Sequence, residues 1–128
     1  MDDVNQFRAL LVSLRSPEDA VRDPAEAAFK EAKASNPSAV AVACVKLMAS
    51  AVDDAAVKPD ARYAAVLLRG MFVGKKQKDT VAKLNEAAQA ALKGDLLAVA
   101  LKEEKASQRR TYCEALSMVA ISFCKAGT

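Results

Sequence analysis

The sequence contains no histidine and no tryptophan, and only four glycines, four prolines and three cysteines in 128 residues. Without histidine the chain lacks the general base of Ser-His-Asp and Cys-His catalytic systems and both ligands of the HExxH zinc motif. The scarcity of glycine and proline argues against a turn-rich β fold. We therefore expect no enzymatic activity, no metal site and no cofactor.

What the chain does contain favours helices. Hydrophobic residues make up 52% of the sequence, charged residues 27% and aromatic residues 5%. About a fifth of the residues are alanine, the strongest helix former. The net charge of +3 is too balanced to indicate nucleic-acid binding by itself. The short apolar runs and the polar start at residues 1–6 predict neither a membrane span nor a signal peptide. We expect a soluble, intracellular, all-α protein.

Cys44, Cys113 and Cys124 are odd in number and fall on predicted apolar helix faces. Their spacing fits neither a disulfide framework nor a metal cluster. We expect three buried free thiols in a reducing compartment.

The periodicity of apolar residues predicts six helices. The first covers about residues 4–14. Ser16 is predicted to cap the second, in which Pro24 restarts or kinks the helix. Asn36-Pro37 opens the third, helix four begins near Asp60, and helices five and six cover about 80–104 and 106–125. The residues predicted to face inward on helix two are Val21, Ala25, Ala28, Phe29 and Ala32.

A pattern recurs along these helices. Aligning Arg22, Arg62 and Arg110 places Ala25, Ala65 and Cys113 three residues later. The arginines are about 40 and about 48 residues apart, which is close to the period of HEAT and armadillo repeats. The sequence therefore predicts an α-solenoid of about three HEAT-type hairpins, at about residues 4–34, 37–74 and 80–125. Such repeats usually bind other proteins.

Polar stripes on the second helix of each hairpin are candidate contact surfaces. Arg62, Val66 and Arg69 share one face of helix four. For Arg62 we favour a structural ion pair with a neighbouring repeat, whereas for Arg69 pairing and partner binding are equally open. Glu26 and Lys30 lie opposite the buried face of helix two. Solvation is the default interpretation of such charges.

Other charged groups carry weaker signals. The loop lysines Lys75, Lys76 and Lys78 could contact phosphates, but no exposed aromatic residues accompany them. The segment 70–76 is not a phosphate loop, since its glycine spacing is one residue short and it follows a helix. The paired acids Asp53-Asp54 and Glu103-Glu104 are interpreted as solvated groups at helix ends.

The segments that carry the repeat resemble a known family. Residues 6–11, 16–22 and 25–29 are similar to the amino terminus of the importin-beta superfamily of nuclear transport receptors, nearest the importin-five or karyopherin-beta-three type. Residues 62–69 resemble its second-repeat motif, and residues 92–113 fit the third repeat. Gly70 and Pro24 depart from the family pattern.

The resemblance implies a HEAT solenoid whose amino-terminal part binds the GTP form of the small GTPase Ran. Because those receptors are far longer, we expect an amino-terminal fragment, with cargo proteins and nucleoporins bound by the rest of the parent chain, in cytoplasm, nucleus and nuclear pore. Helix face and resemblance together nominate the Ran contacts, with Arg69 first, followed by Glu26, Lys30, Arg62, Arg110 and Glu114.

Two alternatives remain open. One is a HEAT-type scaffold for another assembly, without a GTPase partner. The other, less favoured, is a small helical nucleic-acid-binding module that uses the lysine loop.

Overall fold

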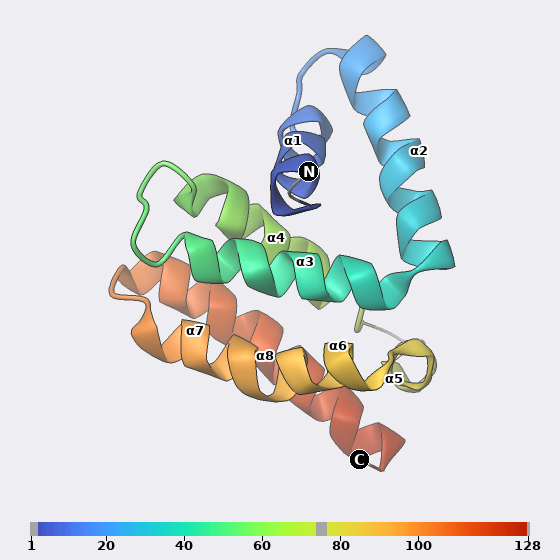
Figure 1. Ribbon diagram of the computed structural model, residues 1–128, viewed down its shortest axis with the longest axis vertical. Coiled ribbons are helices and arrows are strands. Elements are labelled where there is room, and N and C mark those ends of the chain that lie inside the picture. Colours follow the sequence, from blue (N-terminus) through green and yellow to red (C-terminus); the bar gives the residue numbers. More distant parts are fainter. Residues whose placement is uncertain (1–2, 74–76, 128) are drawn as a thin grey trace.

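The computed structural model describes residues 3–73 and 77–127, and these residues are helical with short connections and no strand (Figure 1). The prediction of an all-α fold is confirmed. The helices are α1 (Asp3–Leu14), α2 (Asp19–Ser35), α3 (Pro37–Ser50), α4 (Lys58–Gly70), α5 (Gln77–Lys83), α6 (Glu86–Ala90), the π-helical segment η2 (Ala91–Asp95), α7 (Leu96–Lys102) and α8 (Ala106–Ala126). In the described part of the chain, no helix is both long and apolar enough to cross a bilayer.

Two helix caps were predicted, at Ser16 and at Asn36, and the structure confirms the one at Asn36. At α3, the Asn36 side chain accepts a hydrogen bond from the Ala39 N–H at 3.2 Å, and Pro37 is the first helical residue. The cap predicted at Ser16 is wrong, because Glu18 precedes the first residue of α2. The Ser16 hydroxyl instead accepts the Glu18 N–H at 3.2 Å. This bond forms a turn before α2 and uses the oxygen that a cap would need.

Helix α2 continues through Pro24 without restarting. Its buried face is narrower than predicted, since Ala25 and Phe29 are buried whereas Val21 and Ala28 are exposed. Packing explains the difference: within the described residues, α2 packs on α1 and α3 and makes no substantial contact with α4. A helix supported along one line buries only a narrow stripe.

The helix predicted over residues 80–104 is not one helix. It breaks after Leu84, where the Asn85 side chain accepts the Ala88 N–H at 2.8 Å and caps α6. The Asn85 backbone N–H donates to the Ser38 hydroxyl at 2.9 Å, which ties the break to α3. Gly94 lies in η2. The apolar residues that recur at helical spacing along this region form one buried face despite these interruptions: Val81, Leu84, Ala88, Ala91, Leu92, Leu96 and Val99.

The helices form two layers crossed by the first hairpin. In Figure 1, α3 and the run from α6 to α7 lie in front of α4 and α8, and the α1–α2 hairpin crosses above them. Helix α4 is covered on several sides, since it packs on α3, α8 and α1. One core joins all these elements, and its largest buried side chains include Tyr112, Phe72, Leu11, Leu47, Met48 and Leu68.

The long-range hydrogen bonds of the described residues all join positions separated by a similar number of residues. Each joins residues between 45 and 52 positions apart. A separation this uniform means that each hairpin is bonded to the next one along the chain. The architecture is therefore built from neighbour-to-neighbour junctions.

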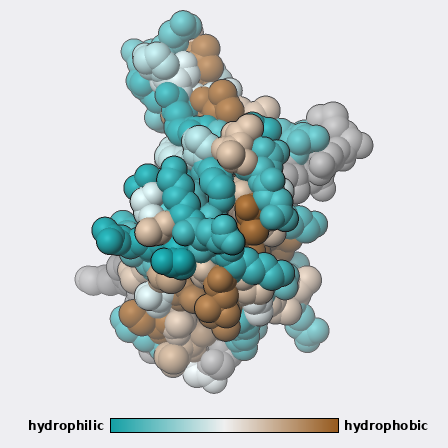
Figure 2. Space-filling view, turned by 90° about the vertical axis from the view of Figure 1, so that its left-hand side faces the viewer, coloured by the Kyte–Doolittle hydropathy of each residue, from teal (hydrophilic) through white to brown (hydrophobic). Residues whose placement is uncertain are grey.

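The terminal hairpin leaves apolar surface exposed. Leu97, Leu101 and Ile121 are exposed, Leu101 to 75%. Figure 2 shows apolar atoms grouped over the lower part of the molecule, at the level of α7 and α8. A groove of about 370 Å³ runs between η2 and α8. It is lined by Leu92, Lys93, Leu116, Val119, Ala120 and Phe123.

Candidate interaction surface

The polar stripe predicted on α4 is exposed. Arg62, Val66 and Arg69 are all accessible, as their i, i+4, i+7 spacing predicts for a single outer face. Arg69 donates from Nη1 to Glu114 Oε2 on α8 at 2.9 Å. The side chains of this ion pair are 44% and 50% exposed. A pair this accessible contributes little to stability, at most about 1 kcal/mol, so both groups are available to a partner.

Arg110 extends the stripe along α8, one turn before Glu114, and it is also exposed. Neither Arg110 nor Arg62 makes an ion pair with any described residue. The structural pairing favoured for Arg62 is therefore not found within the described residues. The acid nearest to it in sequence, Asp60, lies on the buried face of α4 and is bonded instead by Arg8 of α1 and by Arg15, which directly follows α1.

Glu26 and Lys30 lie apart from this stripe. Both are exposed on α2, and Glu26 pairs within its own helix with Arg22, Nε to Oε1, at 3.5 Å. Because α2 does not pack substantially on α4, the structure joins four of the six nominated residues, from α4 and α8, and leaves these two aside.

Asp60 joins α1 to α4, a contact that the sequence reasoning missed. The carboxylate is buried, with Oδ2 accepting from Arg8 Nε at 2.6 Å and Oδ1 accepting from Arg15 Nη2. The Arg15 guanidinium also lies over the Tyr63 ring, 5.5 Å from its centroid. The available signal was the position of Asp60 four residues before Ala64, on the predicted core face, where a carboxylate needs a partner.

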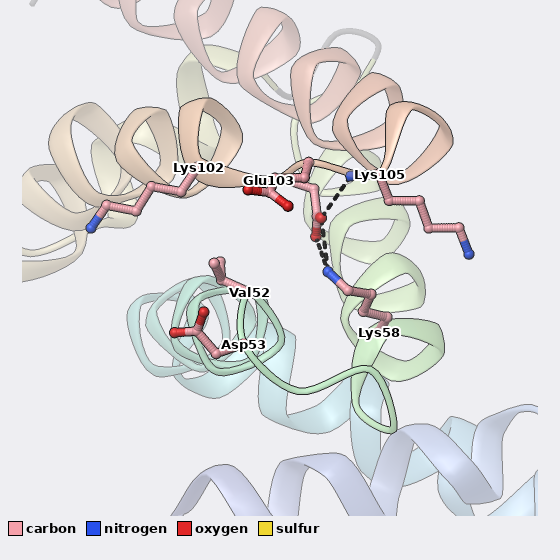
Figure 3. Close-up of a pocket in the computed structure, with 7 residues that line it drawn as sticks. Val52, Asp53, Lys58, Lys102, Glu103 and Lys105 are labelled. Carbon is pink, nitrogen blue, oxygen red and sulfur yellow. Dashed lines mark hydrogen bonds and ion pairs between the residues drawn. The ribbon is translucent and has the colours of Figure 1, made fainter.

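A second ion pair lines a pocket of about 540 Å³ where α4 meets the α7–α8 connection (Figure 3). Lys58 Nζ donates to both Glu103 oxygens, at 2.7 and 2.8 Å, and the Lys105 N–H donates to Oε2 at 3.1 Å. Glu103 is buried, so its interpretation as a solvated acid is wrong, whereas Glu104 is exposed. Lys102 and Lys105 point away from one another in Figure 3, and they do not converge on a common point.

The pKa of Glu103 reflects opposing effects. Burial alone would raise it, but the hydrogen bonds from Lys58 and from backbone N–H groups outweigh burial and lower the pKa below the ordinary 4.5. A carboxylate stabilised in its charged form, with its oxygens already bonded, is suited to hold helices together. It is poorly suited to proton transfer.

Two other candidate features gain no support. Lys75 and Lys76 of the lysine loop lie outside the described residues, as does the side chain of Lys78. No group of three or more acidic or cysteine side chains among the described residues is arranged to hold a metal ion.

The thiols differ from the prediction of three buried cysteines. Cys44 is buried, and burial raises its pKa to about 12, whereas Cys113 and Cys124 are exposed on α8. Each exposed cysteine comes one residue after a buried aromatic residue, Tyr112 or Phe123, and therefore lies beside the buried face of α8 and not on it.

We expect two thiols to react within minutes with a thiol-specific chromophoric disulfide at pH 8 and the third only in denaturant, because a buried, protonated thiol is inert. Three equally fast thiols in the folded protein would contradict this assignment.

In comparisons with known proteins, no family model, no curated protein and no solved structure matches this chain. The resemblance to transport receptors therefore depends on the motif residues alone.

Proposed function

We propose that the chain is the amino-terminal, HEAT-type part of a nuclear transport receptor, and that the exposed stripe on α4 and α8 binds Ran in its GTP form. The observation that supports this most is the Arg69–Glu114 pair, which places charged groups from two successive hairpins side by side and accessible. A ladder of such groups is the surface with which stacked repeats bind partners.

Nucleotide selectivity would follow from rigidity. The switch regions of a GTPase are ordered by the γ-phosphate and released on hydrolysis. A preformed surface that fits only the ordered switch binds the two forms with different affinity, and only such a difference can couple nucleotide state to cargo binding elsewhere. Support for a preformed surface comes from the α4–α8 junction, where both helices are anchored in the common core through Leu68 and Tyr112.

The test is a titration of the protein against Ran loaded with a non-hydrolysable GTP analogue and, separately, with GDP. We expect at least tenfold preference for the GTP form. Binding should be about tenfold weaker for Arg69→Glu, because a negative charge then stands where the arginine would contact the partner. The swapped variant Arg69→Glu/Glu114→Arg keeps the internal pair and should bind as poorly as the single variant. Equal binding of the two nucleotide forms by the folded protein would contradict the proposal.

A further inference from the structure

The arginines of this chain are concentrated on one surface. Six of the seven lie on α1, α4 and α8 or directly after α1, and three ion pairs join these elements laterally. Arg8 of α1 and Arg15, the residue that follows α1, reach Asp60 of α4, and Arg69 of α4 reaches Glu114 of α8. Arg109, which is also on α8, instead donates to the Glu103 carbonyl at 3.3 Å. We call the surface of the other five the arginine surface. It comprises Arg8, Arg15, Arg62, Arg69 and Arg110.

Positive charge is in excess on the arginine surface. The acidic groups that pair with its arginines are Asp60 and Glu114. Asp60 is buried and shared by two guanidinium groups that remain 38% and 32% exposed. Arg62 and Arg110 are exposed and have no ion-pair partner among the described residues. Five cations with two anions leave a field that attracts carboxylates.

Apolar side chains accompany these charges. Val66 is 45% exposed between Arg62 and Arg69, and Val12 of α1 is 54% exposed between Arg8 and Arg15 in sequence. Arginine together with accessible apolar groups is the composition of a protein interface. The planar guanidinium group sheds water readily and binds carboxylates in a bidentate manner. Single-stranded nucleic acid would instead require exposed aromatic rings, and Tyr63, the ring beside this surface, is half-buried beneath Arg15.

We propose that the arginine surface binds a carboxylate-rich face of a protein partner, with α1 as its third helix in place of α2. The packing supports α1, which contacts α4 directly, whereas α2 with Glu26 and Lys30 does not do so substantially. Where the partner is Ran, the inference rests on the proposed function and specifies that the bound face is acidic and that it extends over α1.

The experiment measures binding of a fluorescein-labelled decaglutamate peptide at 20 mM and 150 mM salt, with decauridylate as a second probe. The variant Arg62→Glu/Arg110→Glu alters two exposed, unpaired residues, so it should fold normally. The variant Lys46→Glu/Lys83→Glu makes the same change of charge at exposed positions on α3 and α5, outside the arginine surface. We expect binding of the peptide at low salt, at least tenfold weaker binding for the arginine variant, and less than twofold change for the lysine variant.

Each other outcome overturns the inference. Absence of peptide binding at low salt, or equal losses in the two variants, would show that the surface has no specific attraction for carboxylates. Tighter binding of decauridylate, lost in the arginine variant, would assign the surface to nucleic acid.

The same two variants separate this inference from the proposed function. If Arg62→Glu/Arg110→Glu leaves the binding of GTP-loaded Ran unchanged, the receptor function is retained and the proposal of an acidic partner face is rejected. Peptide binding lost in that variant, together with no binding of Ran, would retain the arginine surface and reject Ran as its partner.

Discussion

Replacing Glu103 by glutamine is expected to lower the free energy of unfolding by about 3 kcal/mol, since removing one member of a buried ion pair leaves the other charge unpaired. The Lys58 side chain is only 18% exposed, so its ammonium group has limited access to water once the carboxylate is gone. Urea unfolding at pH 7 measures this change. Glu104→Gln is the matched control, because Glu104 is the exposed neighbour, and it should change stability by less than about 0.5 kcal/mol.

The pH dependence supplies a second test of Glu103. Its pKa is lowered in the folded protein, so its contribution to stability is present above the ordinary pKa of 4.5 and is lost as pH falls through the folded value. The Glu103→Gln variant should therefore lose less stability than the parent protein between pH 5 and pH 3. Parallel curves for the two proteins would mean that folding does not lower the pKa of Glu103.

Replacing Asp60 by asparagine is expected to release the first hairpin. Asparagine keeps the size of the side chain but presents no charge to Arg8 and Arg15, and we expect a loss of about 2 to 3 kcal/mol. The loss should be local, because α1 packs mainly on α2 of the same hairpin and reaches the other helices through α3 and α4. Amide hydrogen exchange should accelerate in α1 and remain slow in the middle of α8.

Asp53→Asn serves as the control for Asp60, since Asp53 is exposed in the connection before α4 and forms no ion pair with a described residue. It should leave exchange in α1 unchanged. An Asp60→Asn variant that accelerates exchange equally in α1 and α8 would show that Asp60 supports the whole core and has no special role at the first hairpin.

Sequence periodicity predicted the helices well where apolar spacing alone defines them. The apolar residues of α3 and of the 80–104 region are buried at helical spacing, because burial follows the 3.6-residue period whether or not the backbone is interrupted. The interruption itself depends on Asn85, and asparagine marks a helix start only when its side chain reaches a free N–H group. The tie from Asn85 to Ser38 is a tertiary contact that local propensity does not encode.

The candidate surface was predictable within helices but not between them. The stripe of Arg62, Val66 and Arg69 follows from spacing on one helix, whereas the partner of each charge depends on which helix lies beside it. Assigning Glu26 and Lys30 to the same surface assumed that α2 stacks on α4. The structure places α1 there instead, where Arg8 and Arg15 reach Asp60.

The uniform separation of 45 to 52 residues between bonded positions has a consequence for folding. No bond among these requires the two ends of the chain to meet, so the entropy lost on closing each loop is nearly the same at every junction. Folding can then begin at the junction whose side chains pack best, where Leu68 and Tyr112 are fully buried, and spread outward to α1. A destabilising substitution in the first hairpin would therefore slow only the last folding step.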